Sequence, residues 1–464
     1  MLREKLYELK NWREVVHTTW NPDGPGVIRV HMVPPKFTLF KTPPSVAILN
    51  GQELLPVNES WAILLTEFVR GVNAHGPGAM SDETLDGIMQ DAFHRVRAVY
   101  PEVSDEMLRD DLYTIVETFE SVIHGEIPDE EIGMMTLKEY APYMTAPHRM
   151  DLMISAMTKD GKWHCNQRCV HCYAAGQTLA EVKELSTEEW KTVIRKCRSA
   201  RIPQLTFTGG EPTMREDLPE LVSEARWFVT RLNTNGVLMT KELAAALMKA
   251  ELDSAQITLY SADEDIHNRL VGADNWKRSV EGLKNALAAG LNVSVNTPLS
   301  TLNSDYSRML AFLKGLGVEY ATCSGLIVTG NAEGHLSRSM QLSPEDILDA
   351  VRQAASYAAA NNIELSFTSP GWIPPEELME MGLSAPDCGA ALSNMAVTPD
   401  GRVVPCQSWL SGGSLGDMLT DSWKKIWNGH ACRKIREATV ASANVCPLRS
   451  MADQKSSGGG LKTC

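Results

Sequence analysis

The chain has 464 residues, enough for two or three domains, and 43% of them are hydrophobic, an ordinary share for a protein that buries sizeable cores. The net charge is −14 and no long basic tract is present, so we expect no nucleic-acid partner. The sequence has no secretory apolar core at its start and no apolar run of about eighteen residues, so we expect no membrane partner and a cytoplasmic location.

The first 125 residues contain no cysteine and have the pattern of a separate α+β module. Residues 126–149 are predicted to form a linker. The module is predicted to contain two strands, an Asn50-Gly51 hairpin turn and three helices. The predicted strands are Gly26–Val33 and Ser45–Leu49, and the predicted helices are Ser60–Val72, Ser81–Val99 and Ser104–His124.

The order of short strands, then Asn58-Glu-Ser-Trp61, then a later helix pair resembles a RiPP recognition element. This is a small winged-helix-like domain often fused to enzymes that modify ribosomally made peptides (RiPPs). The resemblance implies that the module binds the leader of a precursor peptide as an added strand. The alternative is another small α+β domain, because such domains share this pattern.

Three cysteines lie close together after an apolar run that is predicted to form a strand. Cys165, Cys169 and Cys172 have the spacing Cys-x3-Cys-x2-Cys, and Tyr173 follows them. Cysteine thiolates, usually four, hold iron–sulfur clusters, and three can leave one iron open to a substrate or cofactor. Zinc sites more often use Cys-x2-Cys pairs at two separate places. A zinc site, or three unrelated cysteines, is the alternative.

A second motif, Gly209-Gly210-Glu211-Pro212, directly follows a predicted buried strand. Two glycines leave backbone groups uncovered, so main-chain carbonyls and a carboxylate can hold the amino group of a ligand. The alternative is an ordinary strand-to-helix turn, which glycine and proline also favour.

Together these motifs resemble the radical S-adenosylmethionine (SAM) superfamily. The resemblance implies that the three cysteines hold a [4Fe–4S] cluster whose open iron chelates SAM, and that Tyr173 lies in the cofactor site. It implies that Gly209, Gly210, Glu211 and Pro212 hold the SAM ammonium group. Reduction by an external donor such as flavodoxin or ferredoxin would split SAM to a 5′-deoxyadenosyl radical.

Residues 150–340 alternate predicted strands with amphipathic helices, which predicts an α/β domain with a parallel sheet. Six such units resemble the partial (β/α)6 TIM-like barrel of radical SAM enzymes, with the chemistry at the C-terminal strand ends. The predicted strands are Asp151–Met157, Gln204–Thr208, Val229–Asn233, Ser254–Tyr260, Asn292–Thr297 and Tyr320–Val328. The predicted helices include Thr187–Ala200, Lys241–Lys249, Trp276–Ala289 and Tyr306–Leu316, and residues 341–380 are predicted to add a connecting helix and strand.

Polar residues at other strand ends are candidate SAM contacts, namely Thr234, Ser261 and Asn296, with the stretch Val328–Asn331 after the sixth strand. His171 is expected to stack or bond near the adenine. Each of these residues also fits ordinary turn chemistry.

The C-terminal region, residues 381–464, contains five cysteines. Pro399-Asp-Gly401 lies between two β-type runs and predicts a hairpin that brings Cys406 back toward Cys388. The spacing Cys-x12-Gly-x4-Cys, and the helical stretch Trp423–Asn428, resemble the SPASM and twitch domains, which hold auxiliary iron–sulfur clusters.

The sequence departs from that family at Arg449, which stands where the next cysteine after Cys446 would be. We therefore expect one auxiliary cluster, held by Cys388, Cys406 and Cys446. Either Cys464 is the fourth ligand of this cluster, or the cluster has only three cysteine ligands and one open position. The remaining cysteines are predicted to be buried free thiols, namely Cys197, Cys323 and Cys432.

The resemblance implies a radical SAM enzyme that installs a thioether or carbon–carbon cross-link in a precursor peptide. The sequence singles out no catalytic acid or base. One alternative is a radical SAM dehydrogenase of a small molecule, or a maturase of another enzyme, which would not need a leader-binding module. Another is a non-catalytic interaction protein with structural zinc.

Overall fold

A computed structural model of the protein describes residues 15–20, 28–35, 44–51, 53–75, 80–123, 135–442 and 445–449, with Arg3, Leu6, Tyr7 and Lys10 as isolated positions. It divides into two compact units. The first unit comprises Met1–His148 with Arg198–Gln204, and the second comprises Arg149–Cys197 with Leu205–Cys464. In the parts described, no helix combines the length and apolar character needed to cross a membrane.

The first unit contains an antiparallel sheet with the order β1-β2-β3-β4. The predicted Asn50-Gly51 turn is confirmed, because both residues have positive φ angles (47° and 73°) and join β3 to β4. The sequence did not predict β1 or β4. Pro56 argues against a strand, but β4 is an edge strand, where a missing N–H is tolerated. The strands are β1 (Val16–Trp20), β2 (Ile28–Val33), β3 (Ser45–Leu49) and β4 (Glu53–Val57).

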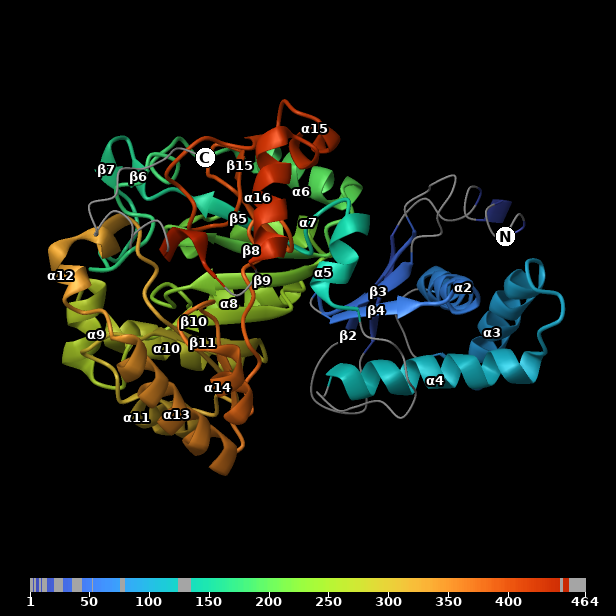
Figure 1. Ribbon diagram of the computed structural model, residues 1–464, viewed down its shortest axis with the longest axis horizontal. Helices are drawn as coiled ribbons and strands as arrows, with labels where there is room; N and C mark the ends of the chain where they lie inside the picture. Colours follow the sequence, from blue (N-terminus) through green and yellow to red (C-terminus); the bar gives the residue numbers. More distant parts are fainter. Residues whose placement is uncertain are drawn as a thin grey trace. The chain divides into compact units, whose positions relative to one another are not determined.

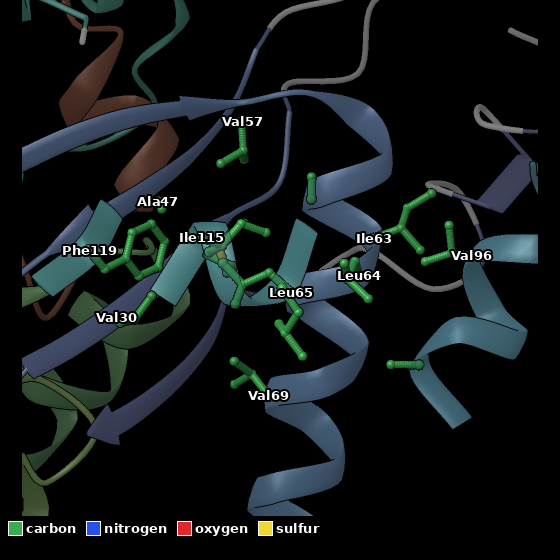
Figure 2. Close-up of a cluster of buried hydrophobic side chains, with 14 of the residues drawn as sticks. Val30, Ala47, Val57, Ile63, Leu64, Leu65, Val69, Val96, Ile115 and Phe119 are labelled. Atoms are coloured by element: carbon green, nitrogen blue, oxygen red, sulfur yellow. The ribbon is translucent and has the colours of Figure 1, made fainter. Parts of the chain in front are cut away.

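Three helices follow, as predicted: α2 (Glu59–His75), α3 (Asp82–Arg97) and α4 (Asp105–Ile123). They share one hydrophobic core with the sheet. Figure 2 shows Phe119 of α4 beside Val30 and Ala47 of the sheet, and Ile115 near Leu65 of α2. Each of these side chains is at most 4% exposed. The first unit therefore has a core of its own, which a separately folding module requires.

The second unit is built on a ten-stranded sheet with the order β13-β12-β11-β10-β9-β8-β5-β14-β15-β16. Strands β9 to β13 run parallel, and the fold class predicted for this part, α/β with a central parallel sheet, is confirmed. In Figure 1 the connecting helices surround this sheet. Its first seven strands along the chain are β5 (Arg149–Ser155), β8 (Gln204–Gly209), β9 (Val229–Thr234), β10 (Ser254–Thr258), β11 (Asn292–Pro298), β12 (Tyr320–Ser324) and β13 (Glu364–Phe367).

The larger helices of this unit are α6 (Thr187–Ser199), α7 (Leu218–Glu224), α8 (Lys241–Lys249), α9 (Glu264–Val271), α10 (Trp276–Ala288), α11 (Tyr306–Gly315) and α13 (Pro344–Ala360). Four of them, α6, α8, α10 and α11, lie within one residue at each end of the ranges that the sequence predicted. The other larger helices were given no bounds. Shorter elements are α5 (Leu137–Tyr140), η1 (Ala141–Tyr143), β6 (Thr158–Lys159), β7 (Lys162–Trp163), η2 (Pro212–Met214), η3 (Gly330–Glu333), α12 (His335–Arg338) and α14 (Pro375–Glu380).

One face of the parallel sheet is polar and only partly covered. On β10 the apolar Ala255 and Ile257 are fully buried, whereas Gln256 between them is half-buried. Gln256 Nε2 donates to Thr322 Oγ1 (3.3 Å), which in turn donates to Asn296 Oδ1 (2.9 Å). Since side chains alternate along a strand, the helices cover the apolar face and leave this polar face accessible.

The predicted C-terminal hairpin is present, but it also extends the main sheet, which the sequence did not indicate. Strand β14 pairs antiparallel with β15 and parallel with β5, the strand that precedes the first group of cysteines. The added strand covers an edge of β5 that would otherwise expose unpaired backbone groups. The elements of this region are β14 (Asn394–Val397), β15 (Arg402–Val404), β16 (Gly416–Asp417), α15 (Trp423–Trp427) and α16 (His430–Ala441).

Candidate active site

Cys165, Cys169 and Cys172 lie in the loop that follows β7, here called the cysteine loop (residues 165–173). The Cys169 thiol is close enough to the other two for their charges to interact. Burial raises the pKa of Cys165 to about 12, and it raises the pKa values of Cys169 and Cys172 as well. A buried thiol stays protonated unless a positive partner offsets the lost hydration, and bound iron is such a partner. The three thiols therefore suit an iron–sulfur cluster.

Backbone groups already point at two of these sulfur atoms. Cys172 Sγ has hydrogen bonds from the N–H groups of Ala174 and Ala175, which oppose the effect of burial on its pKa. A backbone N–H of Gln167 does the same at Cys165. Within the described residues, no three His, Cys, Asp or Glu side chains converge closely enough to hold a single metal ion. Ligands of a four-iron cluster bind different irons, so their sulfur atoms need not converge on one point.

The two glycines of the second motif lie directly against β5. A Cβ atom on Gly209, whose φ is +137°, would lie 2.3 Å from Ser155 O, and one on Gly210 would lie 2.9 Å from Ala156 O. Gly210 N donates to Ser155 O (2.8 Å). No larger residue fits at either position without moving backbone. This close approach brings Gly210 O to 3.3 Å from Cys165 Sγ, so the two sequence motifs meet in one site.

Glu211 turns its carboxylate into the protein, where it is 1% exposed. Oε1 accepts from Thr213 N (3.0 Å), Thr213 Oγ1 (2.5 Å) and Thr234 Oγ1 (2.6 Å), and Oε2 accepts from Asn235 N (2.8 Å). Burial raises its pKa, and these hydrogen bonds oppose the rise. The side chain thus ties the end of β8 to the end of β9. Pro212, which starts η2, is buried beside it.

Two further predicted contact residues also have partners within the protein. Ser261 Oγ accepts from Asp263 N (3.0 Å) at the start of α9. Asn296 Oδ1 accepts from Thr322 Oγ1 on the polar face of the sheet. Each keeps further hydrogen-bonding capacity, since a hydroxyl can also donate and an amide carries two N–H donors.

His171 is 7% exposed, and among the described residues neither of its ring nitrogens has a hydrogen-bond partner. Burial lowers its pKa to about 4, so the ring is neutral at physiological pH. A neutral imidazole has one donor and one acceptor, and both are available here to a ligand. Its ring packs edge-on against Tyr260 at 4.9 Å between centroids.

Tyr260 is a site residue that sequence reasoning missed. Its hydroxyl bonds to Cys169, and burial together with the neighbouring thiols raises its pKa far above the usual value. Its position just after the end of β10 could have indicated this role, but in that stretch only Ser261 was predicted as a contact residue.

The auxiliary cysteines Cys388, Cys406 and Cys446 also come together, because the Cys406 thiol interacts with both others. Burial raises the pKa of Cys406 to about 12. Cys464 lies outside the described residues. The three predicted free thiols, Cys197, Cys323 and Cys432, are confirmed as buried.

Arg449 stands where the SPASM pattern has a cysteine, and its side chain contacts the segment after β13. Its Nη1 donates to Gly371 O, and its guanidinium lies 4.1 Å from the centre of the Trp372 ring. The residue thus ties the end of the auxiliary region to the segment after β13, which is compatible with one cluster fewer than in a full SPASM domain.

Tyr173 lies between the two groups of cysteines. Its side chain interacts with both Cys172 and Cys406. It packs against a buried cluster that includes Met153 of β5 and Val404 of β15. The pairing of β14 with β5 therefore places the auxiliary cysteines near the cysteine loop.

Two family profiles match the chain. Residues 164–314 match the family described as the radical SAM superfamily, and residues 388–448 match SPASM, described as an iron-sulfur cluster-binding domain. The expected domain types in these two regions are thereby confirmed.

Among named proteins, "PqqA peptide cyclase" of Streptomyces rochei is 29% identical over 250 residues, which is 52% of this chain. The match covers 66% of that protein, just under two thirds of its length. Among solved structures, Streptococcus suis SuiB bound to precursor peptide SuiA has a TM-score of 0.57 at 14% identity, covering 85% of this chain and 87% of SuiB. SuiB bound to S-adenosylmethionine also has a TM-score of 0.57, at 15% identity and the same coverage. At these identities the likeness shows a shared fold.

We predict that Glu211→Gln lowers the free energy of unfolding by about 1–3 kcal/mol, because an amide nitrogen cannot accept a hydrogen bond and leaves a buried donor unsatisfied. Denaturant unfolding followed by tryptophan fluorescence measures this change. Glu216→Gln is the matched control, since Glu216 is exposed. Equal stability of the two variants would contradict the role given to Glu211.

Proposed function

We propose that this chain, in which a radical SAM domain precedes a SPASM domain, is a radical SAM enzyme that modifies a ribosomally made precursor peptide. The observation that carries the proposal is the meeting of Cys165, of the cysteine loop, with Gly210 of the second motif. The similarity to a protein named PqqA peptide cyclase, and the fold shared with SuiB, support a peptide as the substrate.

In this proposal Cys165, Cys169 and Cys172 hold a [4Fe–4S] cluster, which when bound supplies the electron that splits SAM into methionine and a 5′-deoxyadenosyl radical. Flavodoxin or ferredoxin is the external donor. The protein binds and orients SAM through the backbone of Gly209 and Gly210, fixed by the Glu211 network. His171, Ser261 and Asn296 supply further polar contacts from neighbouring loops and strands. The partly open polar face of the sheet receives the peptide.

Cys388, Cys406 and Cys446 hold one auxiliary iron–sulfur cluster in this proposal, with Cys464 as a fourth ligand or with an open site. Its place near Tyr173 suits two tasks. It can accept the electron left after bond formation, or bind a substrate thiolate. The product is a thioether or carbon–carbon cross-link within the peptide.

The first unit binds the leader of the precursor. It has its own core and a four-stranded antiparallel sheet, and an extended peptide can add to such a sheet through main-chain hydrogen bonds. A small-molecule enzyme would have no need of this unit.

We predict that replacing Cys165, Cys169 and Cys172 together by Ala abolishes SAM cleavage, because no thiolate remains for the first cluster. The measurement is 5′-deoxyadenosine formed under dithionite by anaerobically reconstituted protein. Cys197→Ala, a buried thiol of α6, should retain activity. Continued 5′-deoxyadenosine production by the triple variant would overturn the assignment.

Variants of the auxiliary cysteines should separate SAM cleavage from peptide modification. Cys388→Ala or Cys406→Ala should lower the iron content and abolish peptide product, while SAM cleavage uncoupled from product continues. Iron analysis and mass spectrometry of the peptide measure these effects. Cys432→Ala is the matched control and should leave both unchanged. Unaltered iron in the Cys388 and Cys406 variants would remove the auxiliary cluster from the proposal.

Deleting residues 1–125 should abolish modification of the full precursor and leave SAM cleavage intact, since this region carries no cysteine. Titration of a labelled leader peptide into the full chain should give a dissociation constant on the order of micromolar, because a flexible peptide loses entropy on binding. Full modification of the precursor by the truncated enzyme would show that the first unit is not a leader-binding domain.

A further inference from the structure

The segment Thr329–Ser337, which follows β12, donates hydrogen bonds to backbone carbonyl groups of the cysteine loop. We call Thr329–Ser337 the clamp segment. Two of these bonds come from Asn331, whose backbone N donates to Cys172 O (2.9 Å) and whose Nδ2 donates to Cys169 O (3.1 Å). Thr329 Oγ1 donates to Tyr173 O (3.2 Å), and Ser337 Oγ donates to Val170 O. Four carbonyls of one short loop are therefore bound by one other segment.

Gly330 shows independently how close the two segments lie. Its φ angle is +61°, and a Cβ atom there would lie 2.5 Å from Tyr173 O and 2.6 Å from Cys172 O. Only glycine allows this approach without displacing backbone. The close packing of the clamp segment against the cysteine loop therefore depends on glycine at position 330.

The Thr329 hydroxyl bonds to the cysteine loop and, among the described residues, not to the helix that follows it. Thr329 directly precedes η3, where a threonine hydroxyl commonly caps the helix. In the described part of the chain it makes no capping bond to η3 and reaches Tyr173 O instead. The peptide group that joins Tyr173 to Ala174 is thus held at its oxygen by Thr329, while its N–H points to Cys172 Sγ.

The C-terminal end of helix α9 accepts hydrogen bonds from backbone N–H groups of the same loop. Arg168 N donates to Val271 O (2.9 Å) and Val170 N donates to Leu270 O (3.0 Å). The helix end binds N–H groups, and the clamp segment binds carbonyls. The N–H groups of Ala174 and Ala175 remain for the sulfur of Cys172.

We propose that Thr329 and Ser337 are positioning residues for the first iron–sulfur cluster, which act by fixing the peptide groups of the cysteine loop. The inference rests on the proposed function and adds to it the residues that tune the cluster. N–H groups aimed at a ligand sulfur stabilise the more negative, reduced cluster and so raise its reduction potential. Removing the Thr329 hydroxyl frees the peptide group that presents one of these N–H groups.

The first test compares Thr329→Val with Thr329→Ser in reconstituted holoenzyme. The valine variant should have a more negative reduction potential for the SAM-binding cluster, and should lose iron to a chelator about 10-fold faster than the wild type. The serine variant keeps the hydroxyl and should recover both values. A valine variant with unchanged potential and iron loss, or a serine variant no better than valine, would overturn the inference.

The second test compares Ser337, at the end of the clamp segment, with Ser339, two residues beyond it. Ser337 is 2% exposed and bonds to the cysteine loop, whereas Ser339 is exposed and bonds locally to Leu336 O (2.7 Å). Ser337→Ala should speed iron loss from the first cluster, and Ser339→Ala should not. Equal rates in the two variants would contradict the clamp role.

The two proposals fail in different ways. If wild-type protein forms no SAM-cleaving cluster, the proposed function fails. If wild type forms it and the Thr329 and Ser337 variants match wild type, only the clamp inference fails.

Discussion

Burial of three thiols in one short loop is the constraint on which the rest of the second unit depends. Burial raises the pKa values of Cys165, Cys169 and Cys172, so none of them ionises readily without a positive partner. A loop that must present such groups in a fixed arrangement cannot rely on its own short-range contacts. Here α9 binds its N–H groups, the segment after β12 binds its carbonyls, and Gly210 lies against its first cysteine. The polar groups that surround the thiols therefore come from strand and helix ends far apart in the sequence.

The sheet makes this convergence possible. Parallel strands present their C-terminal ends at one edge, so the loops after β8, β9, β10 and β12 meet there. Glu211 links two of these ends, since it accepts hydrogen bonds from Thr234 and Asn235. On the other side of β5, strand β14 adds the auxiliary region to the same sheet, and Tyr173 interacts with cysteines of both groups. One sheet thus supports both proposed cluster sites and the polar face described above.

Local signals in the sequence predicted much of this arrangement, and contacts between distant segments account for what it missed. Cysteine spacing, the Gly-Gly-Glu-Pro turn and alternating apolar runs are local, so they predicted the motifs, the four helices and the six strands. The last of these strands, predicted to end at Val328, ends at Ser324. The contact of Glu211 with the SAM ammonium group stays a prediction, and the four hydrogen bonds that its carboxylate accepts from Thr213, Thr234 and Asn235 have no local signal in the sequence. No local pattern shows that β14 pairs with β5, or that Thr329 and Asn331 reach the cysteine loop. Strand β4 was not predicted, and Pro56 is tolerated in it because β4 lies at an edge of the sheet, which no local pattern shows.

Electron paramagnetic resonance of the reduced protein tests the central claim most directly. In a variant with Cys388, Cys406 and Cys446 replaced by Ala, only the cluster of the cysteine loop contributes to the spectrum. The account predicts a reduced [4Fe–4S] signal that changes when SAM is added, because the open iron gains the amino and carboxylate groups of SAM as ligands. A signal unaffected by SAM, or a colourless protein that holds zinc in place of iron, would contradict it.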